Sequence, residues 1–308
     1  MAYMVGLDMG TTYTRIWTQE GGIVLRCPSA AAIDSETHKL VALGAKAKEM
    51  LGKTPQDILA YRPIREGLVS EFEVAARMVR AMFQNKQITS TFNRPVVLMA
   101  TPYRINQVHQ LAAENTVFEG GAKAVAQVPA IFAAAAGAGL RVSSPRGSMI
   151  LNMGGGISEV AVISAGGIIA AHSIKVAGER LDSAVINYLK QRRNLVVGAS
   201  TAEELRITIG TTDNNRILEK DVIVKYIKTR ERFGLKGGEV SNLFSGFLVC
   251  LFGSSVSSDC LQQGVGVYLS SAHPDPCHRS LESRRIHRLQ YIVYASGFEC
   301  LQSIAVIG

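Results

Sequence analysis

LDMGTTYTRI, at residues 7–16, has a counterpart later in the chain, LNMGGGISEV at residues 151–160. Each segment is an apolar run that ends in a polar side chain, followed by a glycine-rich turn and a second strand-like run. Glycine in such a turn leaves backbone N–H groups free to face an anion, and a nearby Asp or Asn can hold a hydrated Mg²⁺. Two turns of this kind that face each other would clamp a di- or triphosphate from both sides.

Other phosphate-binding and catalytic motifs are missing from the sequence. It contains no GxxxxGK(S/T) loop, no GxGxxG that opens a helix after a strand, and no GxSxG nucleophile pattern. A single Gly-Thr or triple-glycine turn is more often an ordinary hairpin than a phosphate site. The presence of both turns in one chain favours phosphate binding.

The composition is that of a folded protein with a large core, because 47% of the 308 residues are hydrophobic and 19% are charged. Residues 243–256 form the longest apolar run, which is interrupted by serines and glycine and is too short to span a membrane. The N-terminus lacks a secretory signal, so we expect a cytoplasmic protein. The net charge of +8 comes from scattered basic residues without interleaved aromatics, so we expect no nucleic-acid partner.

The first 215 residues or so alternate short apolar runs with amphipathic segments, which predicts a layered α/β fold. Near-continuous apolar runs predict buried strands at residues 95–100 and 148–153. Apolar spacing predicts helices at residues 72–83, 129–139 and 178–190. The periodicity fades after about residue 215.

The chain resembles the MreB family of bacterial actin homologues, in the superfamily of actin, sugar kinases and heat-shock chaperone ATPases. Four segments carry the resemblance: GLDMGTTYT (6–14), LGAKAKEMLGKTPQDILAYRPIREGLVSEFEVAARMVRAM (43–82), AAAAGAGLRVSSPRGSMILNMGGGISEVAVISAGGII (133–169) and VAGERLDSAVINYLKQRRNLVVGASTAEELRITIG (176–210). It implies an actin-like ATPase fold of two α/β domains around a nucleotide cleft. We expect domain I at residues 1–140, with a small subdomain at about 30–75, and domain II at 141–308, divergent or incomplete from 216 onward.

The resemblance also implies a nucleotide site. The first phosphate loop would comprise Asp8, Gly10, Thr11, Thr12 and Tyr13. The second would comprise Gly154, Gly155, Gly156 and Ile157, and the nucleoside side would be lined by Gly178, Glu179, Glu203, Glu204 and Arg206. The ligands would be ATP or GTP with Mg²⁺. Family members polymerise into paired filaments on the inner membrane and guide cell-wall synthesis, so we expect the partners to be further copies of the chain, the cell-wall elongation machinery and the inner membrane surface.

The chain departs from the family at positions that matter for catalysis. Asn152 stands where the family has Asp, so a metal held through water by Asp8 and Asn152 should bind weakly. Val128 stands where the family has the Glu that orients the attacking water, and Val cannot position water. Gln127 could substitute only if the backbone shifted. We therefore expect slow or absent hydrolysis.

The loop at residues 87–95 resembles a membrane-facing hydrophobic loop of the family and offers Ile88 and Phe92 for membrane contact. Two apolar side chains contribute little per protomer, so binding would need the avidity of a filament. The alternative is a loop whose Phe92 tucks back into the domain.

Three functions remain open. The preferred one is a nucleotide-binding, filament-forming cytoskeletal protein. The second is a non-polymerising scaffold that keeps the first 215 residues and has lost nucleotide hydrolysis. Separately, no glycine-rich segment resembling GGGAL, which closes over the adenine in the family, follows residue 215, so part of the adenine pocket would be missing. A small-molecule kinase is weaker, because no Asp suited to act as base stands in a recognisable motif.

Overall fold

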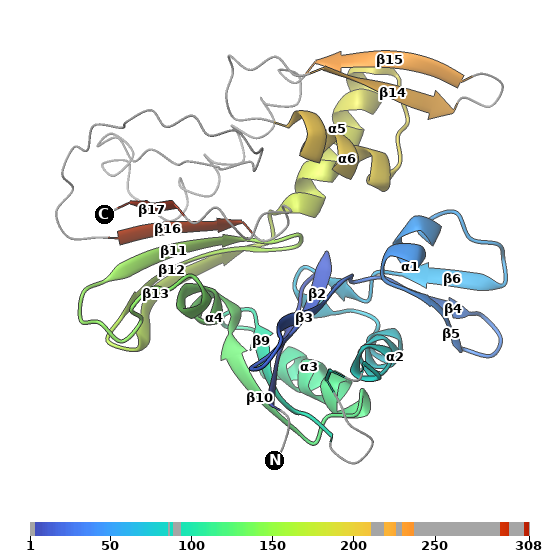
Figure 1. The fold of residues 1–308 in the computed structure, drawn as a ribbon. Coiled ribbons are helices and arrows are strands. Elements are labelled where there is room, and N and C mark those ends of the chain that lie inside the picture. Colours follow the sequence, from blue (N-terminus) through green and yellow to red (C-terminus); the bar gives the residue numbers. More distant parts are fainter. Residues whose placement is uncertain are drawn as a thin grey trace.

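The computed structural model describes residues 4–85, 87–88, 94–210, 219–225, 230–236, 290–295 and 305–307. Figure 1 shows a mixed α/β architecture built on two five-stranded sheets, with a small three-stranded sheet beside the first. None of the described helices combines the length and the hydropathy that a membrane span requires.

The first sheet has the strand order β10-β9-β1-β2-β3. Its strands are β1 (Met4–Met9), β2 (Tyr13–Thr18), β3 (Gly22–Pro28), β9 (Val96–Thr101) and β10 (Ala124–Pro129). β9 lies parallel to both β1 and β10, while β2 and β3 follow β1 as antiparallel hairpins. Side chains alternate along a strand, so Leu7 and Met9 are buried while Asp8 points to the opposite face.

Two helices cover the buried face of the first sheet. These are α2 (Phe72–Phe83) and α3 (Gln107–Glu119). The apolar face of α2 comprises Val74, Met78, Val79 and Met82, which are all buried in one cluster with Leu7 and Met99 of the sheet. The predicted helix at residues 72–83 is therefore confirmed, and so is the strand predicted at 95–100 within one residue.

The second sheet has the order β13-β12-β11-β16-β17. Its strands are β11 (Ser148–Met153), β12 (Ser158–Ser164), β13 (Gly167–Ile174), β16 (Gln290–Ala295) and β17 (Ala305–Ile307). β11 coincides with the strand predicted at 148–153. β16 lies parallel to β11, so part of the region expected to diverge adds backbone strands to this sheet.

Helix α4 (Ala130–Gly137) joins the two sheets. Its residues Ile131 and Ala135 are fully buried and pack against Ile150, Ala161 and Ile163 of the second sheet. Small side chains allow this close approach. The helix is shorter than the predicted 129–139, because Pro129 is the last residue of β10 and the N-cap of the helix.

A helical pair follows the second sheet. α5 (Gly178–Arg193) and α6 (Ala199–Ile209) bury an apolar cluster that includes Val185, Leu189 and Leu205. α5 extends three residues beyond the predicted end and stops at Asn194, which has the left-handed φ of 52° that often ends helices. β14 (Glu219–Lys225) and β15 (Arg230–Lys236) form a separate antiparallel pair.

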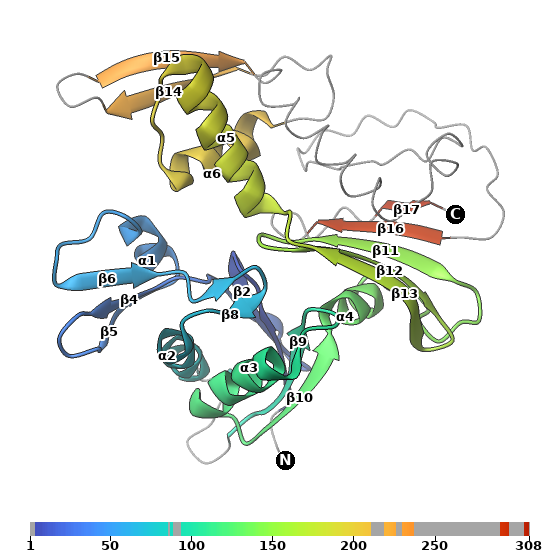
Figure 2. The same ribbon diagram turned by 180° about the vertical axis from the view of Figure 1, so that it is seen from behind.

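The small sheet has the order β5-β4-β6. It consists of β4 (Ala31–Asp34), β5 (Leu40–Leu43) and β6 (Ile58–Tyr61), with α1 (Ala45–Met50) packed beside it. A two-residue pair, β7 (Ile64–Arg65) and β8 (Leu68–Val69), leads on to α2. Figures 1 and 2 show the small sheet and the α5–α6 pair on the same side of the molecule, facing each other.

Candidate functional site

The two glycine-rich turns meet at the junction of the two large sheets. One connects β1 to β2, and the other connects β11 to β12. A Cβ atom added to Gly155 would collide with Thr12 Oγ1, and one added to Gly156 would collide with Thr11 Oγ1 and lie 2.7 Å from Glu66 Cα. The two turns therefore lie in close contact, and only glycine at positions 155 and 156 allows this approach.

Each turn is closed by a backbone hydrogen bond between its first residue and the residue three positions later. Gly10 N donates to Tyr13 O at 3.1 Å, and Gly154 N donates to Ile157 O at 2.9 Å. Within the described residues, the backbone N–H groups of Thr12, Gly155 and Gly156 have no acceptor. These N–H groups are free to hold an anion between the turns.

The second turn also holds the start of α5. Gly178 N donates to Gly154 O at 3.2 Å and Glu179 N donates to Gly155 O at 2.8 Å. The first turn is held from the other side, because Gly67 N donates to Thr11 Oγ1 at 2.9 Å. Sequence reasoning missed Gly67, whose contact with Thr11 depends on how the β7–β8 turn folds back.

Asp8 lies at the base of the first turn and forms an ion pair with Arg15. The distance from Arg15 Nη1 to Asp8 Oδ2 is 2.9 Å, and the two residues are directly opposite in the β1–β2 register. The side chain of Arg15 is only 18% exposed, whereas that of Asp8 is 45% exposed. The carboxylate that was expected to hold a metal is therefore already matched by a cation of the protein.

Asn152 and Glu159 are opposite each other on β11 and β12. Asn152 Oδ1 and Glu159 Oε2 are both buried without a hydrogen-bond partner among the described residues. Glu159 Oε1 accepts from Tyr103 N at 2.8 Å, which links the second sheet to the end of β9. Burial raises the pKa of the Glu159 carboxyl, and the Tyr103 N–H opposes that shift. Glu159 was missed; its signal was a charged residue within the apolar run EVAVIS.

These donors fit Mg²⁺ poorly. Mg²⁺ is usually held by one or two carboxylates together with substrate phosphates and water. Asp8 is paired with Arg15, position 152 carries a neutral amide, and burial favours the uncharged form of Glu159. The described residues contain no group of three or more His, Cys, Asp or Glu that could hold a metal ion.

Val128 and Gln127 lie on opposite faces of β10. Val128, Ala100 and Asp8 are aligned across three neighbouring strands, so Val128 faces the same side as Asp8. Gln127 faces α3, where its Nε2 donates to Gln110 O at 3.1 Å and lies 3.4 Å from Glu114 Oε2. The suggestion that Gln127 replaces the missing Glu is therefore wrong, because strand alternation turns its side chain away.

The residues predicted to line the nucleoside side form ion pairs. Glu203 Oε2 lies 2.8 Å from Lys48 Nζ of α1, and Glu179 Oε1 lies 2.8 Å from Arg62 Nη1. Both pairs connect the small sheet region to the α5–α6 pair, which sequence reasoning did not anticipate. Glu204, in contrast, is exposed on the outer side of α6.

Arg206 is held by a buried partner on the neighbouring helix. Its Nε donates to Asp182 Oδ1 at 2.6 Å, and the guanidinium approaches the start of α5, where a Cβ on Gly178 would lie 3.4 Å from Nη2. Burial raises the pKa of Asp182, and the hydrogen bond from Arg206 opposes that shift. The structure thus brings Gly178, Glu179, Glu203 and Arg206 together beside the second turn.

The membrane prediction is wrong for Ile88. This side chain is 0% exposed and belongs to the core between α2, α3 and the first sheet. An apolar residue in a polar loop can serve the core as well as a membrane, and here it serves the core. Phe92 lies outside the described residues.

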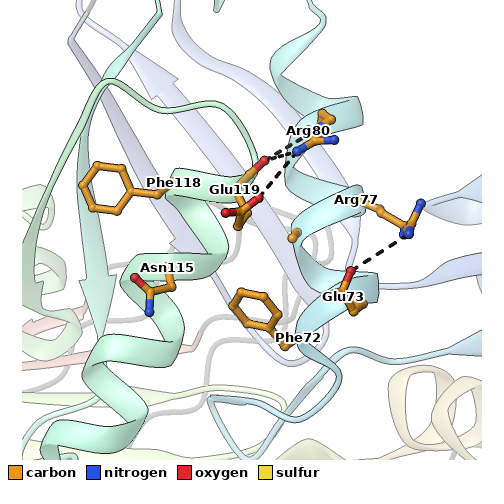
Figure 3. Close-up of a pocket in the computed structure, with 8 residues that line it drawn as sticks. Phe72, Glu73, Arg77, Arg80, Asn115, Phe118 and Glu119 are labelled. Atoms are coloured by element: carbon orange, nitrogen blue, oxygen red, sulfur yellow. Dashed lines mark hydrogen bonds and ion pairs between the residues drawn. The ribbon is translucent and has the colours of Figure 1, made fainter.

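A surface hollow lies away from the turns, between α2 and α3 (Figure 3). Phe72 and Phe118 line it, and Arg80 Nη2 spans the two helices to donate to Glu119 O at 2.6 Å. Arg77 pairs with Glu73 on its own helix at 4.0 Å. The hollow contributes no group to the turns.

The chain is similar in sequence to proteins of one described family. A profile of the MreB/Mbl protein matches residues 2–230. The cell shape-determining protein Mbl of Bacillus subtilis (strain 168) is 36% identical over 207 residues, which is 67% of this chain and 62% of that protein. The cell shape-determining protein MreB of Escherichia coli (strain K12) is 38% identical over 214 residues, or 67% of this chain and 61% of that protein. The match therefore spans less than two thirds of these curated relatives.

Solved structures show the same fold. MreB5 of Spiroplasma citri bound to AMPPNP has a TM-score of 0.75 at 26% identity, covering 85% of this chain and 81% of that chain. The same protein bound to ADP also has a TM-score of 0.75, covering 85% of this chain and 82% of that chain. A MamK double helical filament has a TM-score of 0.69 at 14% identity, covering 82% and 78%, and shares the fold. With a family profile that matches more than half of its length, the chain belongs to the MreB/Mbl family and has an actin-like fold.

Proposed function

We propose that the chain binds ATP or GTP between its two glycine-rich turns and that the bound nucleotide favours assembly into filaments. The observation that carries this proposal is the contact between the turns, where N–H groups of Thr12, Gly155 and Gly156 have no acceptor among the described residues. One relative with the same fold, MreB5 of Spiroplasma citri, has been solved with AMPPNP and with ADP bound.

The chain's own residues suggest how a nucleotide would act. The N–H groups of both turns would hold the phosphates, and Glu179, Glu203 and Arg206 would lie on the nucleoside side. Lys48 and Arg62 pair with Glu203 and Glu179, so a ligand beside these acids would shift the small sheet relative to α5 and α6. Such a shift between two packed bodies is a common route from ligand binding to assembly.

The cellular role follows as part of the same proposal. We place the protein in the cytoplasm on the inner face of the membrane, as two domains near residues 1–140 and 141–308. There, its filaments would guide peptidoglycan synthesis together with the cell-wall elongation machinery. The support comes from relatives described as cell shape-determining proteins.

A second candidate function is a scaffold that has lost hydrolysis and does not polymerise. Val128 favours it, because an apolar side chain on the Asp8 face of β10 cannot position water. Asn152 favours it too, since its neutral amide lowers the negative charge available to a metal. A scaffold would bind its partner protein without nucleotide-dependent assembly.

High-speed sedimentation distinguishes the two candidates. Purified protein is spun with Mg·ATP, with Mg·ADP and without nucleotide, and the pellets are inspected by electron microscopy. Ordered filaments that need ATP would support the cytoskeletal function. Protein that stays in the supernatant under all three conditions would contradict it and favour the scaffold.

A pair of variants links assembly to the turns. Gly156→Ala places a methyl group against Thr11 and the backbone of Glu66, so it should weaken nucleotide binding. Gly137→Ala, at the end of α4, meets nothing within 4 Å and serves as the control. Equal nucleotide binding by both variants would argue against a site between the turns.

A further inference from the structure

Two guanidinium groups lie beside the first turn, in addition to the N–H groups already described. Arg15 Nη1 contacts Asp8 Oδ2 at 2.9 Å, and Arg15 Cζ lies 5.9 Å from the centre of the Tyr13 ring. Arg26, one strand further from Asp8, is exposed and places its Cζ 4.6 Å from the same ring. This corner of the molecule therefore brings two guanidinium groups and the Asp8 carboxyl together.

We infer that Arg15 takes the place of the divalent cation at this site, so that the chain binds its nucleotide as the metal-free polyphosphate anion. The inference rests on the proposed nucleotide site and adds how the phosphate charge is neutralised. It follows from the ion pair between Arg15 and Asp8 together with the neutral side chain of Asn152.

The charges around the first turn argue against a metal. A divalent cation there would have to approach a carboxylate that already contacts a guanidinium at 2.9 Å, so it would meet like charge at short range. Position 152 offers only an amide oxygen, which is a weaker ligand for a hard cation than a carboxylate. The ion pair at Asp8 and the amide at position 152 both lower the affinity for Mg²⁺ at the expected metal site.

The same geometry suits a phosphate held by arginine. A guanidinium has five N–H donors in a rigid fork, and one nitrogen of Arg15 contacts Asp8, which leaves further donors for phosphate oxygens. The other carboxylate oxygen, Asp8 Oδ1, would lie 3.9 Å from a Cβ on Gly10, so the pair reaches the base of the turn. Asp8 thus holds the Arg15 guanidinium beside the first turn.

Nucleotide affinity measured with and without metal tests the inference. The chain has a single tryptophan, Trp17, which lies two residues after Arg15 on the same face and is 49% exposed, so its fluorescence can report binding. ATP is titrated in excess Mg²⁺ and in EDTA. We expect the two dissociation constants to agree within about threefold, which corresponds to less than one charge-assisted hydrogen bond.

Two single variants distinguish the specific contribution of Arg15 to nucleotide affinity from the effect of removing any nearby positive charge. Arg15→Leu should weaken binding in EDTA by about 10- to 100-fold, as expected for losing hydrogen bonds to a charged group. Arg26→Leu removes the same charge one strand away and should leave the ratio of the two dissociation constants unchanged. A double variant, Arg15→Leu with Asn152→Asp, should bind at least about tenfold more tightly with Mg²⁺ than without.

The outcomes are distinguishable. Binding of ATP by the unmodified chain that is tenfold or more tighter in Mg²⁺ than in EDTA would overturn this inference and leave the nucleotide site standing. No binding in either condition would overturn the nucleotide site and this inference together. Because the comparison of the two conditions uses the unmodified chain, it does not depend on whether any variant folds.

Discussion

Lys48 of α1 and Glu203 of α6 form an ion pair at 2.8 Å that connects the small sheet to the second half of the fold. The two residues are 155 positions apart in the chain. The Glu203 side chain is only 9% exposed, and its other nearby cation is Arg62, at 3.9 Å. This contact joins the two parts of the molecule that, in the proposed function, a bound nucleotide would shift relative to each other.

Removing Lys48 should destabilise the protein. Lys48→Ala leaves Glu203 nearly buried with a more distant partner, so we expect a loss of about 1.5–3 kcal/mol in the free energy of unfolding. Urea denaturation measures it. Lys46→Ala, on the exposed side of the same helix, is the control and should change stability by less than about 0.5 kcal/mol. Equal effects of the two variants would show that the ion pair contributes nothing.

The contact between the two turns leads to a second prediction. Gly155→Ala should cost about 1–3 kcal/mol, because the added methyl group would collide with the Thr12 side chain. Gly178→Ala adds a methyl group 3.4 Å from a flexible guanidinium and removes a helical glycine, so it should change stability by less than about 1 kcal/mol. Thermal unfolding compares them. A neutral Gly155→Ala would mean that the turns stand further apart in solution.

Ile88 provides a test of core against membrane. Because the side chain is fully buried, Ile88→Ala should lower the free energy of unfolding by about 2–5 kcal/mol. Ile169→Ala, at a position 68% exposed, should be nearly neutral. Vesicle co-sedimentation of the folded variants completes the experiment. Loss of vesicle binding by Ile88→Ala at unchanged stability would restore the membrane role.

Asp34 gives the stability a pH dependence. Hydrogen bonds from Thr37 N and Oγ1, and from Glu36 N, hold the pKa of the Asp34 carboxyl below its ordinary value. Between the lowered pKa of the folded state and the ordinary pKa of Asp, the unfolded chain therefore binds more protons than the folded chain. The contribution is present above the ordinary Asp pKa and is lost as pH falls through the lowered value.

The variant Asp34→Asn tests whether stability is lost, rather than gained, as the pH falls. It should be less stable than the unmodified chain at pH 7, and the difference should shrink as the pH falls below about 4. Urea midpoints measured across this range give the comparison. A difference that stays constant with pH would show that the Asp34 charge has no part in it.

Features that depend on neighbouring residues in the chain could be predicted from the sequence, whereas contacts between distant segments could not. The strand at β11 and the helix at α2 were predicted because their patterns are local and periodic. The contact between Lys48 and Glu203 could not be predicted, because it depends on how distant segments fold together. Ile88 was assigned to the wrong environment, since one apolar residue in a polar loop carries no periodicity that distinguishes a core from a membrane.

The neighbouring residues Gln127 and Val128 show what backbone register adds to a sequence match. The resemblance to the family indicates that position 128 is altered, but only the strand pairing shows that Val128 shares a face with Asp8 while Gln127 faces α3. Val128→Glu should therefore raise the rate of phosphate release from bound ATP, by about 100-fold if the new carboxylate positions water. Gln127→Glu is the matched control and should leave the rate unchanged, because its side chain lies against Gln110 and Glu114. Faster release from Gln127→Glu than from Val128→Glu would mean that β10 presents the opposite face to the nucleotide.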